Sequence, residues 1–240
     1  RLGIHITVYR NITRNQILDV LLDPTSGYSR AVLNGGKVRN QGIELVLTGT
    51  PVTNPDFKWN TTITWSRNWN RVLELAEGMD DQQPIGAGGN ASIIAKVGGT
   101  TGSIYGFGFL RAPDGQIIWD ANGLPARPAN IQYIGEAYAD WRGGVMNEFT
   151  YKNWRFSFLV DGQYGGLIYS QTHHKMTEQG KLKHTLKGRE DGYIVGQGVV
   201  NDGGTFKQNT KQVNLADYYA DVWRRANVES NSFDASFLKL

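Results

Sequence analysis

The 240-residue chain contains no cysteine, so disulfide bonds, thiolate zinc sites and cysteine nucleophiles are all excluded. Long apolar runs are also missing, because no run of consecutive hydrophobic residues exceeds three positions. A membrane-spanning helix needs roughly 20 such residues, whereas a membrane-spanning strand needs only alternation. The net charge of +3 comes from cations and anions dispersed along the whole chain. This excess is too small and too scattered to indicate nucleic-acid binding.

Apolar and polar residues alternate along much of the chain. The even-numbered residues from Leu2 to Val8 share one face of the first segment, for example, and Gly3 to Tyr9 share the other. A period of two over several residues predicts a β-strand. Such strands are expected at about residues 2–11, 38–50, 57–69, 142–152 and 154–164, with a sixth that begins near Ser232. The sequence therefore predicts an all-β fold.

The connections between these strands alternate between short and long. Residues 51–56 and Asn153 form short turns, whereas 12–37, 70–141 and 165–231 form long connections. A soluble barrel or sandwich keeps most loops to roughly 4–6 residues. Outer-membrane barrels have short periplasmic turns and long extracellular loops, and their strands need about 9–11 residues. The pattern therefore favours part of a large antiparallel transmembrane β-barrel.

Aromatic residues at the predicted strand ends are typical of the interfacial girdles of membrane barrels. They are Tyr9, Trp59, Trp69, Tyr151, Trp154 and Tyr164. Alternation alone does not distinguish a lipid-facing apolar surface from a soluble core. A soluble carbohydrate-binding or lectin-like β-domain is therefore the alternative interpretation.

Several segments carry a family resemblance. Residues 34–44 read N-G-G-K-V-R-N-Q-G-I-E. This text resembles the N-x-G-x-x-x-N-x-G-x-E segment that starts a late barrel strand in the SusC/RagA family of TonB-dependent outer-membrane receptors. Further similar segments follow in the family's order, at residues 106–125, 133–135, 161–166 and 234–240. The chain departs from the family at 136–141, where a proline-containing segment is usual.

This resemblance implies that residues 1–240 are the C-terminal portion of a receptor barrel of about 22 strands. The N-terminal plug domain and the TonB-contact segment would then lie outside this chain. The implied function is TonB-dependent import of oligomeric nutrients across the bacterial outer membrane, with a SusD-like lipoprotein at the mouth. Oligosaccharides are the first expected ligand and oligopeptides the second. The resemblance implies no enzymatic activity and no cofactor.

Other motifs have simpler explanations. Gly86 to Ala91 matches G-x-G-x-x-A, but the strand-to-helix context of a dinucleotide site is not expected there, so we interpret it as a glycine loop. His173, His174 and His184 have no carboxylate at a metal-ligand spacing, and we expect no metal. The Lys-rich stretch from Lys175 to Arg189 is interpreted as a solvated loop, with phosphates of lipopolysaccharide or an acidic ligand as the alternative.

Candidate catalytic residues are not predicted. Glu44, Glu148 and Asp161 fall on the polar face of three different strands, where a water-filled lumen explains them without catalysis.

Candidate ligand contacts follow from strand direction. If the short turns are periplasmic, the extracellular mouth is lined by Tyr9, Asn68 and Arg142 together with the loop 70–141. Within that loop Trp119 lies between two predicted glycine turns, Asp114-Gly115 and Asn122-Gly123, which would present it at a hairpin tip. A flat aromatic ring there could stack on sugars or peptide side chains. Packing of Trp119 inside the loop is the alternative.

Overall fold

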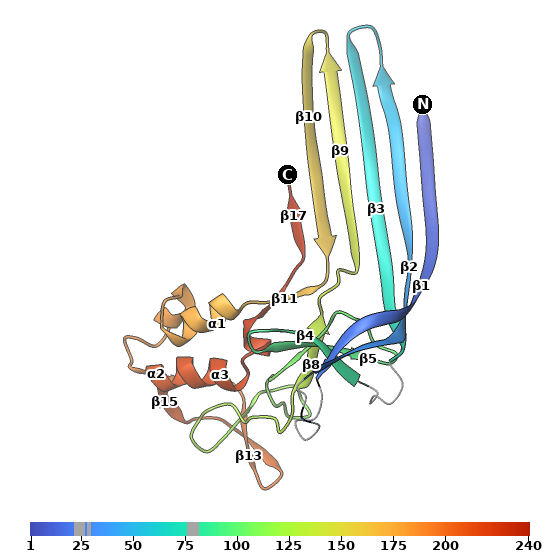
Figure 1. Cartoon of the computed structure of the whole chain (residues 1–240). Helices are drawn as coiled ribbons and strands as arrows, with labels where there is room; N and C mark the ends of the chain where they lie inside the picture. Colours follow the sequence, from blue (N-terminus) through green and yellow to red (C-terminus); the bar gives the residue numbers. More distant parts are fainter. Residues whose placement is uncertain (22–26, 28–29, 76–81) are drawn as a thin grey trace.

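The computed structural model describes residues 1–21, 27, 30–75 and 82–240. A six-stranded sheet dominates it (Figure 1), with the strand order β1-β2-β3-β9-β10-β17 and antiparallel neighbours throughout. The strands are β1 Leu2–Leu21, β2 Arg30–Thr53, β3 Phe57–Glu74, β9 Trp141–Tyr151, β10 Trp154–Tyr164 and β17 Phe237–Lys239. The sheet is open, as expected for part of a barrel.

Cross-strand partners share one face of a sheet, so the register assigns every side chain to a face. Glu44 lies opposite Ser66, which lies opposite Arg142, and these residues define the polar face. The other face carries most of the apolar side chains of the five long strands. Its side chains are largely uncovered: Leu2 is 75% exposed and Trp154 is 80% exposed. A contiguous apolar surface of this kind requires a non-aqueous partner, which in a transmembrane barrel is lipid.

The first connection differs from expectation. Residues 12–37 were predicted to be a long loop, but β1 and β2 stay paired as far as Leu21 and Arg30. Residues 22–26 and 28–29 of this connection lie outside the described part. The prediction was wrong because it ended the strands where the apolar alternation ends. Backbone pairing needs no apolar face, so the hairpin continues past the membrane band.

The sixth predicted strand is split. Residues Ser232–Asp234 form β16, which pairs with β11, Leu167–Tyr169, and only β17 joins the large sheet. Ser236 lies between them, and its backbone N–H and hydroxyl both bond to Asp234 Oδ1, at 2.8 and 2.6 Å. This local turn interrupts the strand.

The long connections fold into one body, which we call the loop body and which comprises residues 82–140 and 165–236. One sheet has the order β4-β5-β6-β8, and another has the order β14-β13-β7. The bounds are β4 Gln82–Gly88, β5 Ala91–Lys96, β6 Ser103–Gly106, β7 Ile118–Trp119, β8 Gln132–Glu136, β12 Tyr193–Val195, β13 Val199–Asp202, β14 Thr205–Gln208 and β15 Gln212–Asn214.

Short helices complete the loop body. They are α1 Gln171–Glu178, α2 Leu215–Asp217, α3 Trp223–Arg225, the 3-10 turns Lys183–Leu186 and Glu229–Asn231, and the π-helical turn Tyr218–Val222. Within the described residues, none of the helices has the length and apolarity to cross a membrane, a finding that does not bear on β-barrels.

The buried core lies in the loop body and where it meets the sheet. Ala91, Ile104 and Val228 form one cluster, and Ala112, Ile118 and Val199 form another. A third joins Val38 and Val72 of the long strands to Ala95 of β5. This third cluster attaches the loop body to the polar face of the sheet, because Val38 and Val72 are cross-strand partners on that face.

Candidate ligand-binding mouth

The two long connections emerge at the same end of the sheet, opposite the short turns (Figure 1). β3 runs from the turn at 54–56 toward the loop body, β9 returns, and β10 runs toward the loop body again. This arrangement follows from antiparallel pairing with alternating short and long connections. The predicted mouth therefore lies at the end of the sheet where the polar face meets the loop body.

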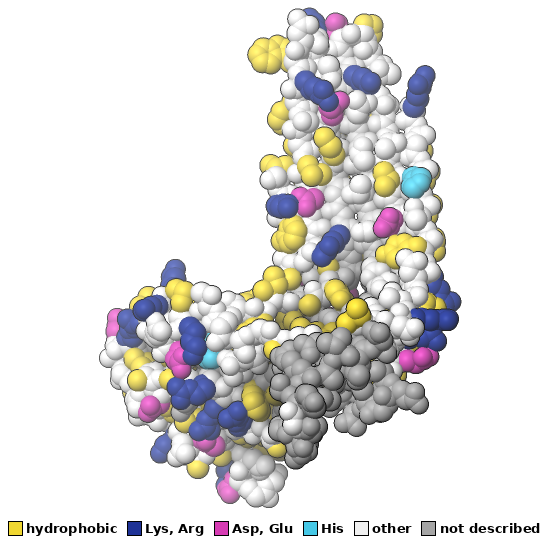
Figure 2. Space-filling view, in the orientation of Figure 1, with side chains coloured by type: hydrophobic (Ala, Val, Ile, Leu, Met, Phe, Trp, Pro, Cys, Tyr) yellow, Lys and Arg dark blue, Asp and Glu magenta, His cyan; other side chains and the backbone are white. Residues whose placement is uncertain are grey.

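The polar face carries charges of both signs along its length (Figure 2). A concave region of about 670 Å³ lies over it near the mouth, lined among others by Glu44, Arg142 and Asp161. The Arg142 Nε donates to Gln163 Oε1 at 3.2 Å, and Lys239 Nζ lies 3.5 Å from Asp161 Oδ2. These groups are hydrogen-bond donors and acceptors suited to a polar ligand or to another polar protein segment.

Tyr9 and Asn68, two of the predicted contacts, are joined directly. The Tyr9 hydroxyl donates to Asn68 Oδ1 at 2.9 Å, and its ring lies over Gly42. The Asn70 side chain donates to Asn40 Oδ1 at 2.9 Å on the same face. Asn40, Gly42 and Glu44 are the last three matching positions of the segment that resembles the family. Its glycine is explained by the Tyr9 ring, which leaves no room for a Cβ at position 42.

This network continues into the loop body. The Thr101 backbone N–H donates to Asn70 Oδ1 at 2.8 Å, and the Thr101 hydroxyl bonds to the Tyr138 hydroxyl, also at 2.8 Å. Tyr138 in turn lines a small cavity of about 170 Å³ with Asn68 and Arg142. The structure thus brings three predicted residues, Tyr9, Asn68 and Arg142, into one neighbourhood.

Sequence reasoning missed several members of this neighbourhood. Asn40, Asn70, Tyr138 and Gln163 were not predicted as part of the site. Asn40 carried a signal, since it stands in the segment that resembles the family. Asn70 shares strand parity with Asn68, which also could have revealed it. Tyr138 and Gln163 depend on how the loop body folds back, which no local pattern in the sequence specifies.

Trp119 does not lie at an exposed tip. Its turns form as predicted, with Gly115 at φ +87° and Gly123 at φ +79°, but the indole is only 3% exposed. The ring stacks on Tyr218 at 6.2 Å between centroids, and Nε1 donates to the Gln197 carbonyl at 2.9 Å. The predicted exposure is wrong because a second connection, 165–231, packs onto the first. Trp119 instead packs inside the loop body, as the alternative interpretation stated.

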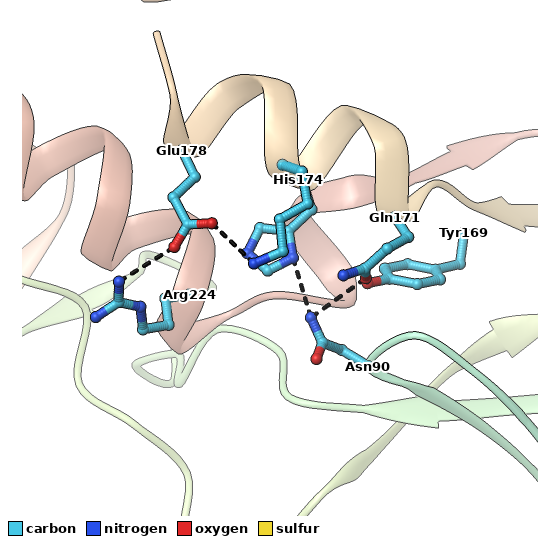
Figure 3. A network of polar contacts seen from close by, with 7 residues as sticks. Asn90, Tyr169, Gln171, His174, Glu178 and Arg224 are labelled. Atoms are coloured by element: carbon cyan, nitrogen blue, oxygen red, sulfur yellow. Dashed lines mark hydrogen bonds and ion pairs between the residues drawn. The ribbon is translucent and has the colours of Figure 1, made fainter.

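A polar network holds helix α1 in the loop body (Figure 3). Asn90 donates to His174 Nδ1 at 3.0 Å, and Arg224 donates to Glu178 Oε1 at 3.1 Å. The Ser170 hydroxyl caps the helix by accepting from the His173 backbone N–H at 3.1 Å. His174 is 3% exposed, and burial lowers its pKa below the ordinary value. The neutral imidazole therefore has a structural role as a hydrogen-bond acceptor.

The segment at 136–141, where the chain departs from the family, is also structurally defined. Glu136 accepts hydrogen bonds from three hydroxyls, those of Thr100, Ser103 and Tyr133. Burial, together with the charge of Glu136, raises the pKa of Tyr133 to about 12. The carboxylate thus ties β6, β8 and the turn at 97–102 together.

The weaker motifs have no catalytic or metal-binding geometry. Gly86 to Gly88 end strand β4, Gly89 and Asn90 form the turn and Ala91 begins β5, so the segment is a hairpin rather than a glycine loop and leads into a strand, not a helix. Among the described residues there is no cluster of three or more potential metal ligands. Glu148 is paired with Arg155, and Asp161 with Lys239.

Comparisons with known proteins agree with the fold and the sequence patterns. No family model matches the chain. It is 26% identical over 194 residues to the TonB-dependent receptor P3 of Formosa agariphila, covering 72% of this chain and 19% of that protein. It is 29% identical over 150 residues to the TonB-dependent receptor SusC of Bacteroides thetaiotaomicron, covering 57% of this chain and 15% of that protein.

Solved structures of the RagAB peptide transporter have the same fold. One matches with a TM-score of 0.65 and 18% identity over 100% of this chain and 26% of the other. The structure in the closed-closed state matches with a TM-score of 0.68 and 16% identity over 99% of this chain and 26% of the other.

The fold and the relatives together define the class. The chain is a segment of a large antiparallel transmembrane β-barrel with long loops at one end. The predicted resemblance to TonB-dependent receptors of the SusC/RagA kind is confirmed. These relatives are named as receptors and transporters, not as enzymes, in agreement with the sequence. The chain spans about a fifth of the length of the curated receptors that it matches.

Proposed function

We propose that residues 1–240 are the C-terminal portion of the barrel of a TonB-dependent importer of oligomeric nutrients. The plug and the TonB-contact segment lie outside this chain in this proposal, and a SusD-like lipoprotein covers the mouth. The observation that carries it is the joining of Tyr9, Asn68 and Arg142 with the loop body over the polar face. A mouth of this kind offers amide, hydroxyl and guanidinium groups to a polar ligand.

Oligosaccharides are the proposed ligand class, and oligopeptides are the alternative. The site near Asn68 is rich in neutral side-chain amides and hydroxyls, namely those of Asn40, Asn70, Thr101 and Tyr138. Such groups match sugar hydroxyls, which both donate and accept. The peptide alternative is favoured by the similar fold of RagAB, a peptide transporter and importer.

A soluble carbohydrate-binding domain fits the molecule less well. A soluble domain would bury its apolar strand face, whereas Ile4 and Val8 are 61% and 73% exposed. Phe156, several strands away, is 62% exposed on the same face. Detergent or lipid therefore has to cover this surface.

The test uses the full-length receptor in its own host. Uptake of labelled oligosaccharides and of labelled oligopeptides is measured in a receptor deletion strain complemented with wild-type receptor, Asn68→Ala or Arg142→Ala. We expect uptake of one ligand class to be lost in the deletion strain, and binding by the variants to weaken by about 1–3 kcal/mol if these are central contacts. The matched control is Thr61→Ala, on the outward face of β3. Equal uptake of both classes with and without the receptor would refute the proposal.

A further inference from the structure

A group of cations lies on the outward, apolar face of the sheet rather than on the polar face. Register places Arg39 between Ile12 and Arg71, and Ile43 between Val8 and Arg67. The group, which we call the outward basic patch, consists of Arg10, Arg14, Lys37, Arg39, Arg67 and Arg71.

The patch begins where the apolar band ends. Arg10 follows Val8 on the same face of β1, and Arg67 follows Trp65 on the same face of β3. Two residues of a strand span about 7 Å, so the first cations lie within one such step of the lipid-facing side chains. The long connections emerge at this end of the sheet. The patch therefore lies on β1, β2 and β3, directly beyond the apolar band and on the side of the long connections.

In the described part of the chain, a single ion pair links the patch to a carboxylate. Lys37 pairs with Glu74, with 2.9 Å between Nζ and Oε1. No other ion pair between the patch and a carboxylate occurs in the described part of the chain. Arg39 Nε is buried without a hydrogen-bond partner, directly beside Arg71. Two adjacent guanidinium groups repel each other unless an anion lies between them.

Aromatic side chains surround the patch at the same level. The Arg67 guanidinium lies over the Trp69 ring, with its carbon 4.9 Å from the ring centroid. Trp141 and Tyr164 stack on the outward face of β9 and β10 with 6.1 Å between centroids. Trp and Tyr at this depth mark the membrane–water interface. An anion bound by these arginines would therefore lie at the membrane surface.

We propose that the outward basic patch binds the phosphate groups of a phosphorylated glycolipid, of the lipid A type, in the outer leaflet. Arginine forks bind phosphate oxygens in bidentate fashion, and the apolar strand residues beside them cover acyl chains. The inference rests on the proposed outer-membrane location. It concerns a lipid site on the barrel exterior, separate from the nutrient site at the mouth.

The experiment uses purified full-length receptor in mild detergent. Wild-type receptor is titrated with lipid A in its phosphorylated form, with enzymatically dephosphorylated lipid A, and with inorganic phosphate. We expect tight binding of the phosphorylated lipid only. The variant R39Q/R67Q/R71Q should bind it about 100-fold more weakly, at roughly fivefold per cation. The charge-retaining variant R39K/R67K/R71K should recover part of the affinity, because lysine keeps the positive charge but lacks the bidentate fork.

A matched control removes three cations at the opposite end of the sheet, from β3, the β9–β10 turn and β10. The variant K58Q/K152Q/R155Q should retain wild-type affinity for the phosphorylated lipid, because its cations lie near the short turns. Equal binding of the two lipid A forms by wild-type receptor would overturn the proposal, even if a variant fails to fold. So would unchanged affinity in R39Q/R67Q/R71Q. Loss of surface-lipoprotein capture with unchanged lipid binding would assign the patch to a protein partner instead.

Separate measurements distinguish refutation of the lipid site from refutation of the proposed function. Heat-modifiable migration reports barrel formation, and uptake in complemented cells reports import. A receptor that forms a barrel and imports nutrient but binds both lipid A forms equally refutes only the lipid site. A receptor that binds phosphorylated lipid A selectively but supports no uptake refutes only the import proposal.

Discussion

The Tyr9 hydroxyl bonds to Asn68 across Gly42, so one aromatic ring spans three strands of the polar face. The ring replaces the side chain that glycine lacks and covers the backbone at the mouth. This contact depends on position 42 having no Cβ. The glycine at this position of the family-like sequence pattern is therefore required by the packing of the Tyr9 ring.

Gly42→Ala should therefore damage the barrel segment. A Cβ at position 42 would lie 2.4 Å from the Tyr9 hydroxyl and 2.6 Å from the Arg67 carbonyl oxygen. We expect a cost of about 1–3 kcal/mol, because a backbone atom on one side prevents relaxation. Gly49→Ala is the matched control in the same strand, since its Cβ would meet its nearest neighbour at 3.7 Å. The measurement is the temperature at which the full-length receptor loses heat-modifiable migration. Equal shifts for both variants would contradict the prediction.

The two faces of β10 should respond oppositely to charge. Phe158 lies on the outward face and packs near Phe149, with 6.2 Å between ring centroids, whereas Ser157 lies on the polar face. Phe158→Arg should cost about 2–4 kcal/mol because it places a cation at mid-depth of the bilayer. Ser157→Arg should be tolerated. The amount of folded receptor in the outer membrane is the readout, and similar losses for both substitutions would mean that the assignment of faces is inverted.

The sequence was sufficient for the sheet but not for the loop body. Strand parity is local, so alternation from Leu2 to Val8 or across Phe156 and Phe158 predicts a face without knowledge of the partners. Tyr9, Asn68 and Arg142 could be placed at the mouth for the same reason. Trp119 could not be placed, because its burial depends on Tyr218, almost 100 residues later in the chain. Long-range packing between two connections leaves no periodic signal in either.

Helix α1 should loosen on acidification. Burial lowers the pKa of His174 and of His184 below the ordinary value of 6.5. The folded loop body therefore favours the neutral rings, and the unfolded segment binds protons first as pH falls. The two neutral histidines contribute fully to the stability of the loop body above about pH 6.5. This contribution declines as pH falls from there toward their lowered pKa values. Hydrogen exchange of residues 171–186 in the full-length receptor, corrected for intrinsic rates, should show faster local opening at about pH 5.5 than at about pH 7.5.

His174→Gln tests which side chain is responsible. Glutamine can accept the hydrogen bond from Asn90 but does not titrate. The variant should keep α1 folded and lose part of the pH dependence of exchange in that helix. Lys175→Gln, on the exposed side of the same helix, should leave the His174-dependent part in place. An unchanged pH dependence in His174→Gln would remove His174 from this explanation.

Trp119→Ala should act through the loop body before it acts on any ligand. The indole is buried, is stacked on Tyr218 and donates to the Gln197 carbonyl, so its removal leaves a cavity and an unpaired carbonyl. We expect a local cost of about 3–5 kcal/mol, measured as faster hydrogen exchange in residues 193–222. Gly196→Ala should disturb the packing of the same indole, because a Cβ at position 196 would lie 2.2 Å from it. Both variants should loosen the same segment, with the barrel strands unaffected. Weaker ligand capture by Trp119→Ala at normal exchange rates would instead restore the direct contact predicted from the sequence.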